Sequence, residues 1–193
     1  MKKSTSILLG MAVALVMGCS GNLSPTEFAN PRFDFGFVER VAVLPFENLT
    51  GDQNAGHRAA RLMTTELLAS GALDVVEAGE VQAALARRPG AVYGRVALPS
   101  KEDILGLGQE LNVQALIMGT VTQSETLRSG RVGIPVVTID ARMVETETGS
   151  TVWASTHTEK GSTVSARVLG TSGTPISQTT RLCIQQLLQS LFE

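Results

Sequence analysis

Val41-Ala42-Val43-Leu44 is an unbroken apolar run, followed by Pro45 and by the turn residues 48–52, Asn-Leu-Thr-Gly-Asp. A strand with one solvated face alternates apolar and polar residues, whereas a strand covered on both faces is apolar throughout. Proline and the turn residues are typical of the end of a strand. We therefore expect a central strand at residues 41–44, with other elements packed on both of its faces.

Helical and strand patterns follow this strand along the chain. Residues 54–70 have an apolar stripe at helical spacing and end at Gly71, which is typical of a helix C-terminus. Ser100 and Asp103 resemble a capping box and predict a helix from there to residue 112. Two further helices are expected at residues 80–87 and from Pro175 onward, and further strands at residues 73–76, 115–121, 137–143 and 151–156.

The order of these elements is β-α-β-α-α-β-β-β-α. A β-α-β order favours parallel crossovers, and three consecutive strands favour an antiparallel meander. The sequence therefore predicts a mixed α/β (α+β) fold. Its sheet has about five strands, both parallel and antiparallel, with helices packed on it.

The beginning of the chain resembles a bacterial lipoprotein signal. Two lysines precede an apolar run at residues 7–17, which is shorter than the ~20 residues of a membrane-spanning helix. A lipobox then reads Leu-Val-Met-Gly-Cys at residues 15–19. This resemblance implies that residues 1–18 are removed and that Cys19 carries lipid, including palmitate-type acyl chains. An ordinary signal peptide with a cysteine nearby is the alternative.

Residues 19–37 are expected to form a lipidated tether ahead of one domain at residues 38–193. Residues 20–31 show no helical or strand periodicity, which is typical of a flexible linker. Beyond them, Phe33, Phe35 and Phe37 alternate with other residues and would lie on one side of an extended segment. They would either cover the domain's own sheet or helix, or contact a neighbouring protomer or partner.

Charge and cysteine content exclude some classes of function. The formal net charge is −2, and removal of the two N-terminal lysines makes the chain more acidic, so nothing favours nucleic-acid binding. The second of the two cysteines, Cys183, lies on the apolar face of the last expected helix and is predicted to be a buried, inert thiol.

No pattern of a catalytic or metal site is found in the sequence. His57 and His157 lack metal-ligand spacing, and no nucleophile motif occurs. Gly106 and Gly108 fall within an expected helix and not in a phosphate-binding turn. We therefore expect no catalytic residue, no cofactor and no metal. A small-molecule binder or weak hydrolase that pairs Asp52 with His57 remains the alternative from another class.

Three stretches, taken in order, resemble the CsgG-like and LpoB-like periplasmic lipoproteins. They are residues 41–51, 108–121 and 145–153, and the resemblance spans residues 38–193. Known members are mostly non-enzymatic: CsgG is an oligomeric outer-membrane channel that exports curli subunits, and LpoB activates a peptidoglycan synthase. The transmembrane hairpins of CsgG are not recognisable, because residues 123–135 carry charges on both faces of the alternation and residues 159–174 lack an apolar return strand.

The resemblance implies a protein anchored to the outer membrane through Cys19, with its domain facing the periplasm. It would bind and regulate, or help to assemble, an envelope complex such as a peptidoglycan synthase, a transporter or an export apparatus. The alternative is a ring-forming component of a secretion or motility assembly, and hence a homo-oligomer. Contacts are expected at Phe33, Phe35, Phe37 and the loop at residues 161–173.

Overall fold

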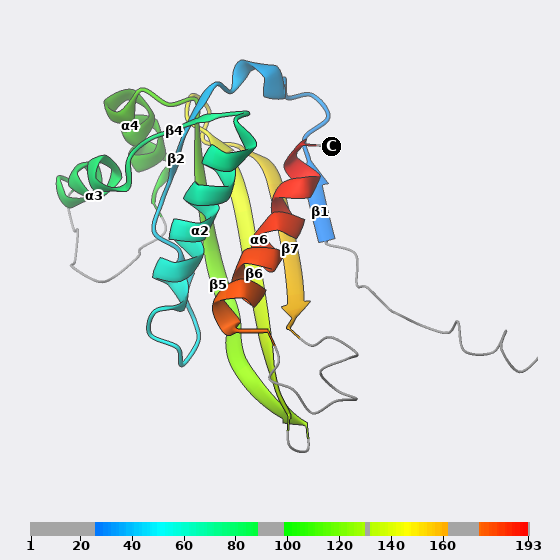
Figure 1. The fold of residues 1–193 in the computed structure, drawn as a ribbon. Helices are drawn as coiled ribbons and strands as arrows, with labels where there is room; N and C mark the ends of the chain where they lie inside the picture. Colours follow the sequence, from blue (N-terminus) through cyan, green and yellow to red (C-terminus); the bar gives the residue numbers. More distant parts are fainter. Residues whose placement is uncertain (1–25, 89–98, 130–131, 162–173, 193) are drawn as a thin grey trace, which may run out of the picture.

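The computed structural model describes residues 26–88, 99–129, 132–161 and 174–192, and it consists of one mixed sheet with helices on both faces (Figure 1). The strands are β1 (Thr26–Ala29), β2 (Arg40–Val43), β3 (Glu47–Asn48), β4 (Asp74–Val75), β5 (Ala115–Ser129), β6 (Val132–Glu145) and β7 (Thr151–Lys160). The helices are α2 (Ala55–Ser70), α3 (Ala78–Ala86), α4 (Lys101–Leu111) and α6 (Ile176–Phe192), with a short 3₁₀ turn, η2 (Phe35–Phe37).

The strand order in the sheet is β1-β7-β6-β5-β2-β4, and β3 also pairs with β5. The first strands are parallel, since β2 pairs with both β4 and β5 in that sense. From β5 onward the neighbours are antiparallel: β5 with β6, β6 with β7, and β7 with β1. The expected mixed sheet, with parallel crossovers followed by a meander, is confirmed.

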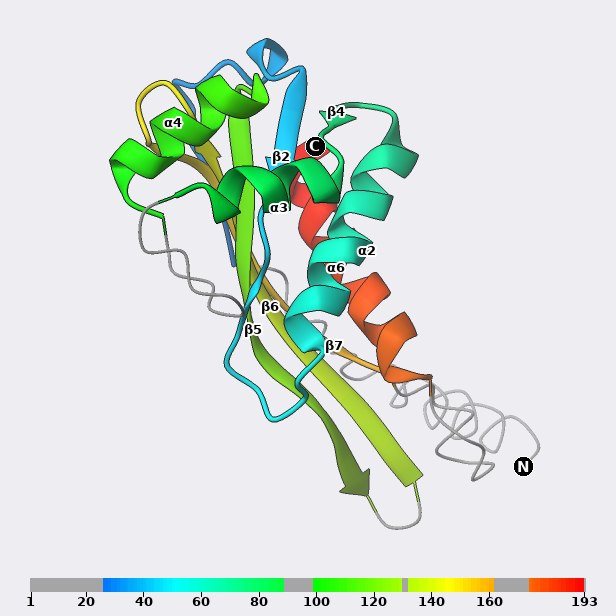
Figure 2. The same cartoon turned by 90° about the vertical axis from the view of Figure 1, so that its left-hand side faces the viewer.

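Two apolar layers cover β2 and the beginning of β5. Alternate residues of β2 point to opposite faces, so Val41 and Val43 join one cluster while Ala42 joins the other. Helices α2 and α6 lie side by side on the first face, and α3 and α4 cover the second (Figures 1 and 2). The largest buried helical side chains of the first layer are Met63, Leu67, Ile184 and Leu187, and those of the second are Leu107 and Leu111.

The expected capping box at α4 is present. The Ser100 hydroxyl accepts a hydrogen bond from the Asp103 backbone N–H at 3.2 Å, and the Asp103 carboxylate accepts one from the Ser100 N–H at 3.1 Å. These bonds satisfy two backbone donors that the first turn would otherwise leave unpaired. Helix α2 ends at Gly71, which is left-handed at φ 66°, as the sequence pattern indicates.

The N-terminal segment differs from its expected structure in two places. Residues 26–29, predicted to lie in the tether, form β1, because the edge of β7 offers backbone partners from Trp153 to Thr156. Residues 35–37 form the turn η2 and not an extended segment. The Asp34 carboxylate accepts a hydrogen bond from the Gly36 N–H at 3.0 Å and so closes the turn.

The second half of β5 and the first half of β6 extend beyond the body of the domain (Figure 2). The sequence indicated strand only at residues 115–121 and 137–143. The pairing instead continues past residue 121, with a register shift between Val121 and Gln123, and joins Leu127 to Ile134. Cross-strand backbone hydrogen bonds maintain this hairpin although its β5 half, residues 125–128, is exposed.

Within the described part of the chain, every helix is too short or too polar to cross a bilayer.

Replacement of Leu187 by alanine tests the layer formed by α2 and α6. Leu187 is completely buried, and we expect Leu187→Ala to lower the free energy of unfolding by about 2–5 kcal/mol, because it leaves a cavity. Leu182→Ala on the same helix is the matched control, since Leu182 is 38% exposed and should cost about 0.5 kcal/mol or less. Urea denaturation measures both changes, and equal losses would contradict this packing.

Candidate functional site

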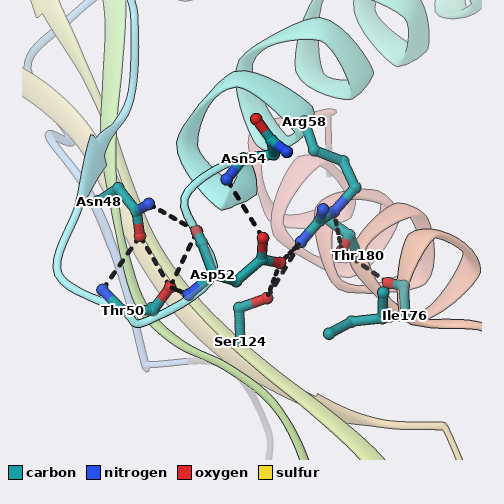
Figure 3. Close-up of polar contacts among 8 residues, drawn as sticks. All are labelled: Asn48, Thr50, Asp52, Asn54, Arg58, Ser124, Ile176 and Thr180. Atoms are coloured by element: carbon teal, nitrogen blue, oxygen red, sulfur yellow. Dashed lines mark hydrogen bonds and ion pairs between the residues drawn. The ribbon is translucent and has the colours of Figure 1, made fainter. Parts of the chain in front are cut away.

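A polar cluster lies where the segment β2–β3 ends and α2 begins, a position at which open α/β sheets often bind ligands. The turn is built by its own side chains (Figure 3). The Asn48 amide donates to the Asp52 carbonyl at 2.8 Å, and its carbonyl oxygen accepts from the Thr50 N–H at 3.0 Å. The Thr50 hydroxyl accepts from the Asp52 N–H at 3.2 Å. These bonds hold the Asp52 side chain toward α2 and β5.

The Asp52 carboxylate is bound from three directions (Figure 3). Its Oδ2 atom forms an ion pair with the Arg58 guanidinium and accepts a hydrogen bond from the Ser124 hydroxyl at 3.1 Å. Its Oδ1 atom accepts from the Asn54 N–H at 3.2 Å. The hydrogen bond from Arg58 is the main reason why the pKa of Asp52 lies below its usual value, and burial opposes it. The carboxylate is therefore held ionised.

Arg58 connects this turn to two other elements. Its Nη2 atom donates to the Ser124 hydroxyl on β5 at 3.1 Å, and its Nε atom donates to the Thr180 hydroxyl on α6 at 3.4 Å. The Thr180 hydroxyl in turn donates to the Ile176 carbonyl at 2.7 Å. We call Asp52, Arg58, Ser124 and Thr180 the polar clasp. It joins the β3–α2 turn, α2, β5 and α6 at the base of the long hairpin.

The predicted pairing of Asp52 with His57 is wrong. His57 is exposed on α2, and Asp52 pairs with Arg58 on the next position of the helix. Successive helical residues point in different directions, so only one of them can face the turn. Because the Asp52 oxygens and the Ser124 hydroxyl already bind other groups of the clasp, the arrangement is suited to holding elements together.

Cys183 is buried on α6, as the sequence indicates. Its Sγ atom lies 3.4 Å from the backbone carbonyl of His157, to which the thiol donates. Burial raises the pKa of the Cys183 thiol to about 12, so the reactive thiolate is disfavoured at neutral pH. His157 is also buried, on β7, with Nε2 3.3 Å from the Glu159 carboxylate.

The glycines of α4 allow close packing. A Cβ atom at Gly108 would lie 2.3 Å from the Cβ of Thr146, and one at Gly106 would lie 2.4 Å from the Arg88 guanidinium. Both positions lie inside the helix and not at its N-terminus, as the sequence predicts. Among the residues that the structure describes, no group of three or more His, Cys, Asp or Glu side chains is arranged to hold a metal ion.

The three phenylalanines predicted as contacts have different environments. Phe33 and Phe35 pack edge to face, with ring centroids 5.1 Å apart, and both lie against the core layer formed with α2 and α6. Phe37 is 48% exposed on η2. The structure thus separates two packing residues from one exposed aromatic side chain. Cys19 and residues 162–173 of the predicted contact loop lie outside the described residues.

Sequence reasoning missed one surface, the side of β6, β7 and β1 that faces away from α6. A hollow of about 320 Å³ lies on it, between Met118 on β5 and the exposed Phe28 on β1. Asp140 accepts a hydrogen bond from Thr156 there, while Arg142 has no ion-pair partner among the described residues. The alternation of Thr138, Asp140 and Arg142 in the sequence was the available signal, because it marks a polar strand face.

Comparison with known proteins adds fold neighbours. No family model matches the chain, and no curated protein matches it. The PelC dodecamer from Paraburkholderia phytofirmans matches with a TM-score of 0.60 at 22% identity, over 87% of this chain and 96% of that one. Lipoprotein GNA1162 from Neisseria meningitidis matches with a TM-score of 0.56 at 16% identity, over 80% and 98% of the two chains.

These identities are low, so the two matches show a shared fold. The LpoB C-terminal domain from Salmonella enterica, from the group that the sequence resembles, gives a TM-score of 0.48 at 12% identity over 62% of this chain and 81% of that one. That similarity is too weak to carry an argument. The resemblance to CsgG stays a prediction.

Replacement of Asp52 by asparagine tests the clasp. Because the folded-state pKa of Asp52 is lowered, its carboxylate stabilises the fold above its unfolded pKa of about 4 and this contribution is lost as the pH falls through the folded pKa. We expect Asp52→Asn to cost about 1–3 kcal/mol at pH 7 and less at pH 3, as measured by urea denaturation.

Asp74→Asn is the matched control for this experiment. Asp74 also lies near an arginine, 3.5 Å from Arg40 Nε, but its side chain is 67% exposed. Exposed ion pairs contribute about 1 kcal/mol or less. A cost of Asp52→Asn that does not shrink in acid would mean that the ion pair does not stabilise the fold.

Two serine substitutions separate packing from partner contact at the phenylalanines. We expect Phe35→Ser to lower the free energy of unfolding by about 2 kcal/mol, since the ring is partly buried on the core. Phe37→Ser should change it by about 0.5 kcal/mol or less, because the ring is exposed. If Phe37 contacts a partner, crosslinking in cells should lose that partner in Phe37→Ser, and unchanged capture would exclude the contact.

Proposed function

We propose that this chain is a lipid-anchored accessory protein of the bacterial envelope, with its domain in the periplasm, that acts by binding and not by catalysis. The observation that carries the proposal is the fold itself. It matches over 80% of the chain a protein described as a lipoprotein, GNA1162, and over 87% the PelC dodecamer. The lipobox that ends at Cys19 supports the same anchored class.

A binding role is also supported by how the polar groups are used. At the end of the sheet where a ligand would be expected, the clasp residues bind one another, so the carboxylate of Asp52 is not available as a base. The thiol of Cys183 is buried and stays protonated. By contrast, the sheet face with Phe28 and Arg142 offers apolar and charged groups to a partner.

Lipid on Cys19 would keep the domain close to the bilayer. Six residues separate Cys19 from Thr26, the first residue of β1, and the seven Cα–Cα steps between these two residues span about 25 Å at most in an extended chain. An accessory protein on so short a tether reaches partners that are themselves embedded in the membrane or lie directly beside it. Peptidoglycan synthases, transporters and export complexes meet this condition.

Assembly into a ring is the second candidate, favoured by the PelC dodecamer. A ring needs two different surfaces on each protomer that fit each other head to tail. The sheet provides unlike edges for this purpose, the four-residue strand β1 at one end of the strand order and the two-residue strand β4 at the other.

Native mass spectrometry of the full chain, extracted from membranes in mild detergent, tests these proposals together. We expect the subunit mass to show processing before Cys19 with the acyl chains attached, and Cys19→Ala to abolish both the added mass and the membrane association. Cys183→Ala is the control, because that thiol is buried and should leave both unchanged.

The stoichiometry separates the two candidates. A complex with another envelope protein supports the accessory role, and a closed ring of many copies supports the second candidate. If Cys19→Ala keeps the protein in the membrane fraction with an unchanged mass, the anchoring proposal is wrong.

A further inference from the structure

The N-terminal end of β1 is directed toward the long hairpin. Strands β5 and β7 both run toward the hairpin tip, because each is antiparallel to β6. Strand β1 is antiparallel to β7 and therefore runs away from the tip. The N-terminal end of β1, at Thr26, therefore points toward the hairpin (Figure 1).

The hairpin arm consists of the exposed residues 125–128 of β5 and of residues 133–136 of β6, of which Pro135 and Val136 are buried at its base, and it points away from the body (Figure 2). Its base is held by Ser124, which belongs to the polar clasp. Along the arm, Leu127 is 45% exposed and pairs across the strands with the half-buried Ile134. An apolar pair with one exposed member on a projecting arm is a feature of surfaces that contact an apolar partner.

The register places this pair at the distance that the tether can reach. Thr26 pairs with Thr156, and Thr156 pairs with Asp140, so these residues lie at one level of the sheet. Ile134 lies six residues further toward the tip, or about 20 Å along a strand. The six-residue tether between Cys19 and Thr26 can span at most about 25 Å. A lipid on Cys19 can therefore hold the bilayer surface at the level of Leu127 and Ile134.

We propose that the hairpin arm rests on the lipid bilayer, with Leu127 and Ile134 entering the interfacial region and Arg128 lying among the lipid headgroups. This inference rests on the proposed anchoring through Cys19. Apolar side chains suit this region because they leave water there, and Arg128, although it points to the other face of the strand, has a long stem that allows its charge to stay with anionic headgroups. At the base of the arm, the exposed Lys160 pairs with Val136 and is positively charged, while the exposed Glu125 pairs with the same residue from β5 and is negatively charged.

The tether explains why so small a contact would suffice. The acyl chains fix the domain beside the membrane, so the contact of the arm is intramolecular in effect and is favoured by a high local concentration. The arm would then set the orientation of the domain. The two contacts, lipid and arm, would hold the β7 and β1 edge and its hollow at a defined angle to the bilayer.

Fluorescence quenching of the full lipidated chain in vesicles of phosphatidylethanolamine and phosphatidylglycerol tests the proposal. Leu127→Cys receives an environment-sensitive fluorophore, and labelling is selective because Cys19 is acylated and Cys183 is buried. The matched control is Leu68→Cys, since Leu68 is also exposed, at 53%, but lies near the C-terminal end of α2, away from the arm (Figure 1). A nitroxide quencher is carried on the acyl chains of the lipid.

The lipid quencher should reduce emission from position 127 several-fold more than emission from position 68. Adding Ile134→Glu to the labelled protein should remove most of this difference, because a carboxylate next to the label opposes entry into the interface. Equal quenching at both positions would overturn the proposal, as would quenching that Ile134→Glu leaves unchanged.

Two further outcomes are distinguishable from these. Position 127 protected from aqueous iodide but not reached by the lipid quencher would mean that the arm binds a second copy or another protein, and the proposal would be wrong. Vesicle flotation of the same samples reports the anchoring separately. A chain that does not float would overturn the proposed anchoring together with the arm contact, whereas floating protein with an unquenched arm would overturn the arm contact alone.

Discussion

Burial on both faces of the sheet at β2 and at the beginning of β5 is the constraint on which the other elements depend. Helices α2 and α6 cover Val41 and Val43, and α3 and α4 cover Ala42 on the opposite face. Removal of either layer would expose apolar strand residues to water. The parallel pairing of β2 with β5 then requires a long connection, which α2, β4, α3 and α4 provide. The antiparallel strands β5 and β6 need only a short turn between them, so their hairpin can extend into solvent.

The polar clasp connects the packed helices α2 and α6 to the base of the hairpin. Ser124 is the last buried residue of β5 before the exposed arm, and it bonds to groups from the β3–α2 turn and α2. Arg58 also binds Thr180 on α6, so the base of the arm is fixed to both helices of one layer. Asp52 and Arg58 lie at the end of the sheet where open α/β folds often bind ligands, and here they hold the hairpin of β5 and β6 in its direction.

A function through binding agrees with this use of the side chains. The surfaces left for partners are the polar side of β6, β7 and β1, the exposed Phe37 and the hairpin arm. The proposed lipid on Cys19 would limit all of them to partners at the membrane. Fold neighbours such as PelC, which forms a dodecamer, indicate that the same architecture is compatible with assembly of many copies.

Strong local patterns were enough to identify most elements, including the apolar run of β2, helix α2 and the capping box at Ser100, because these depend on neighbouring residues. Three features depend on residues far apart in the chain. Strand β1 has no pattern of its own and exists because β7 offers an edge. Asp52 pairs with Arg58 and not with His57 because Arg58 is the residue of α2 that faces the turn. Ser124 of β5, 72 residues away from Asp52, binds the carboxylate on the same side of α2. The hairpin arm continues into the exposed residues 125–128 because cross-strand backbone hydrogen bonds do not require a buried face.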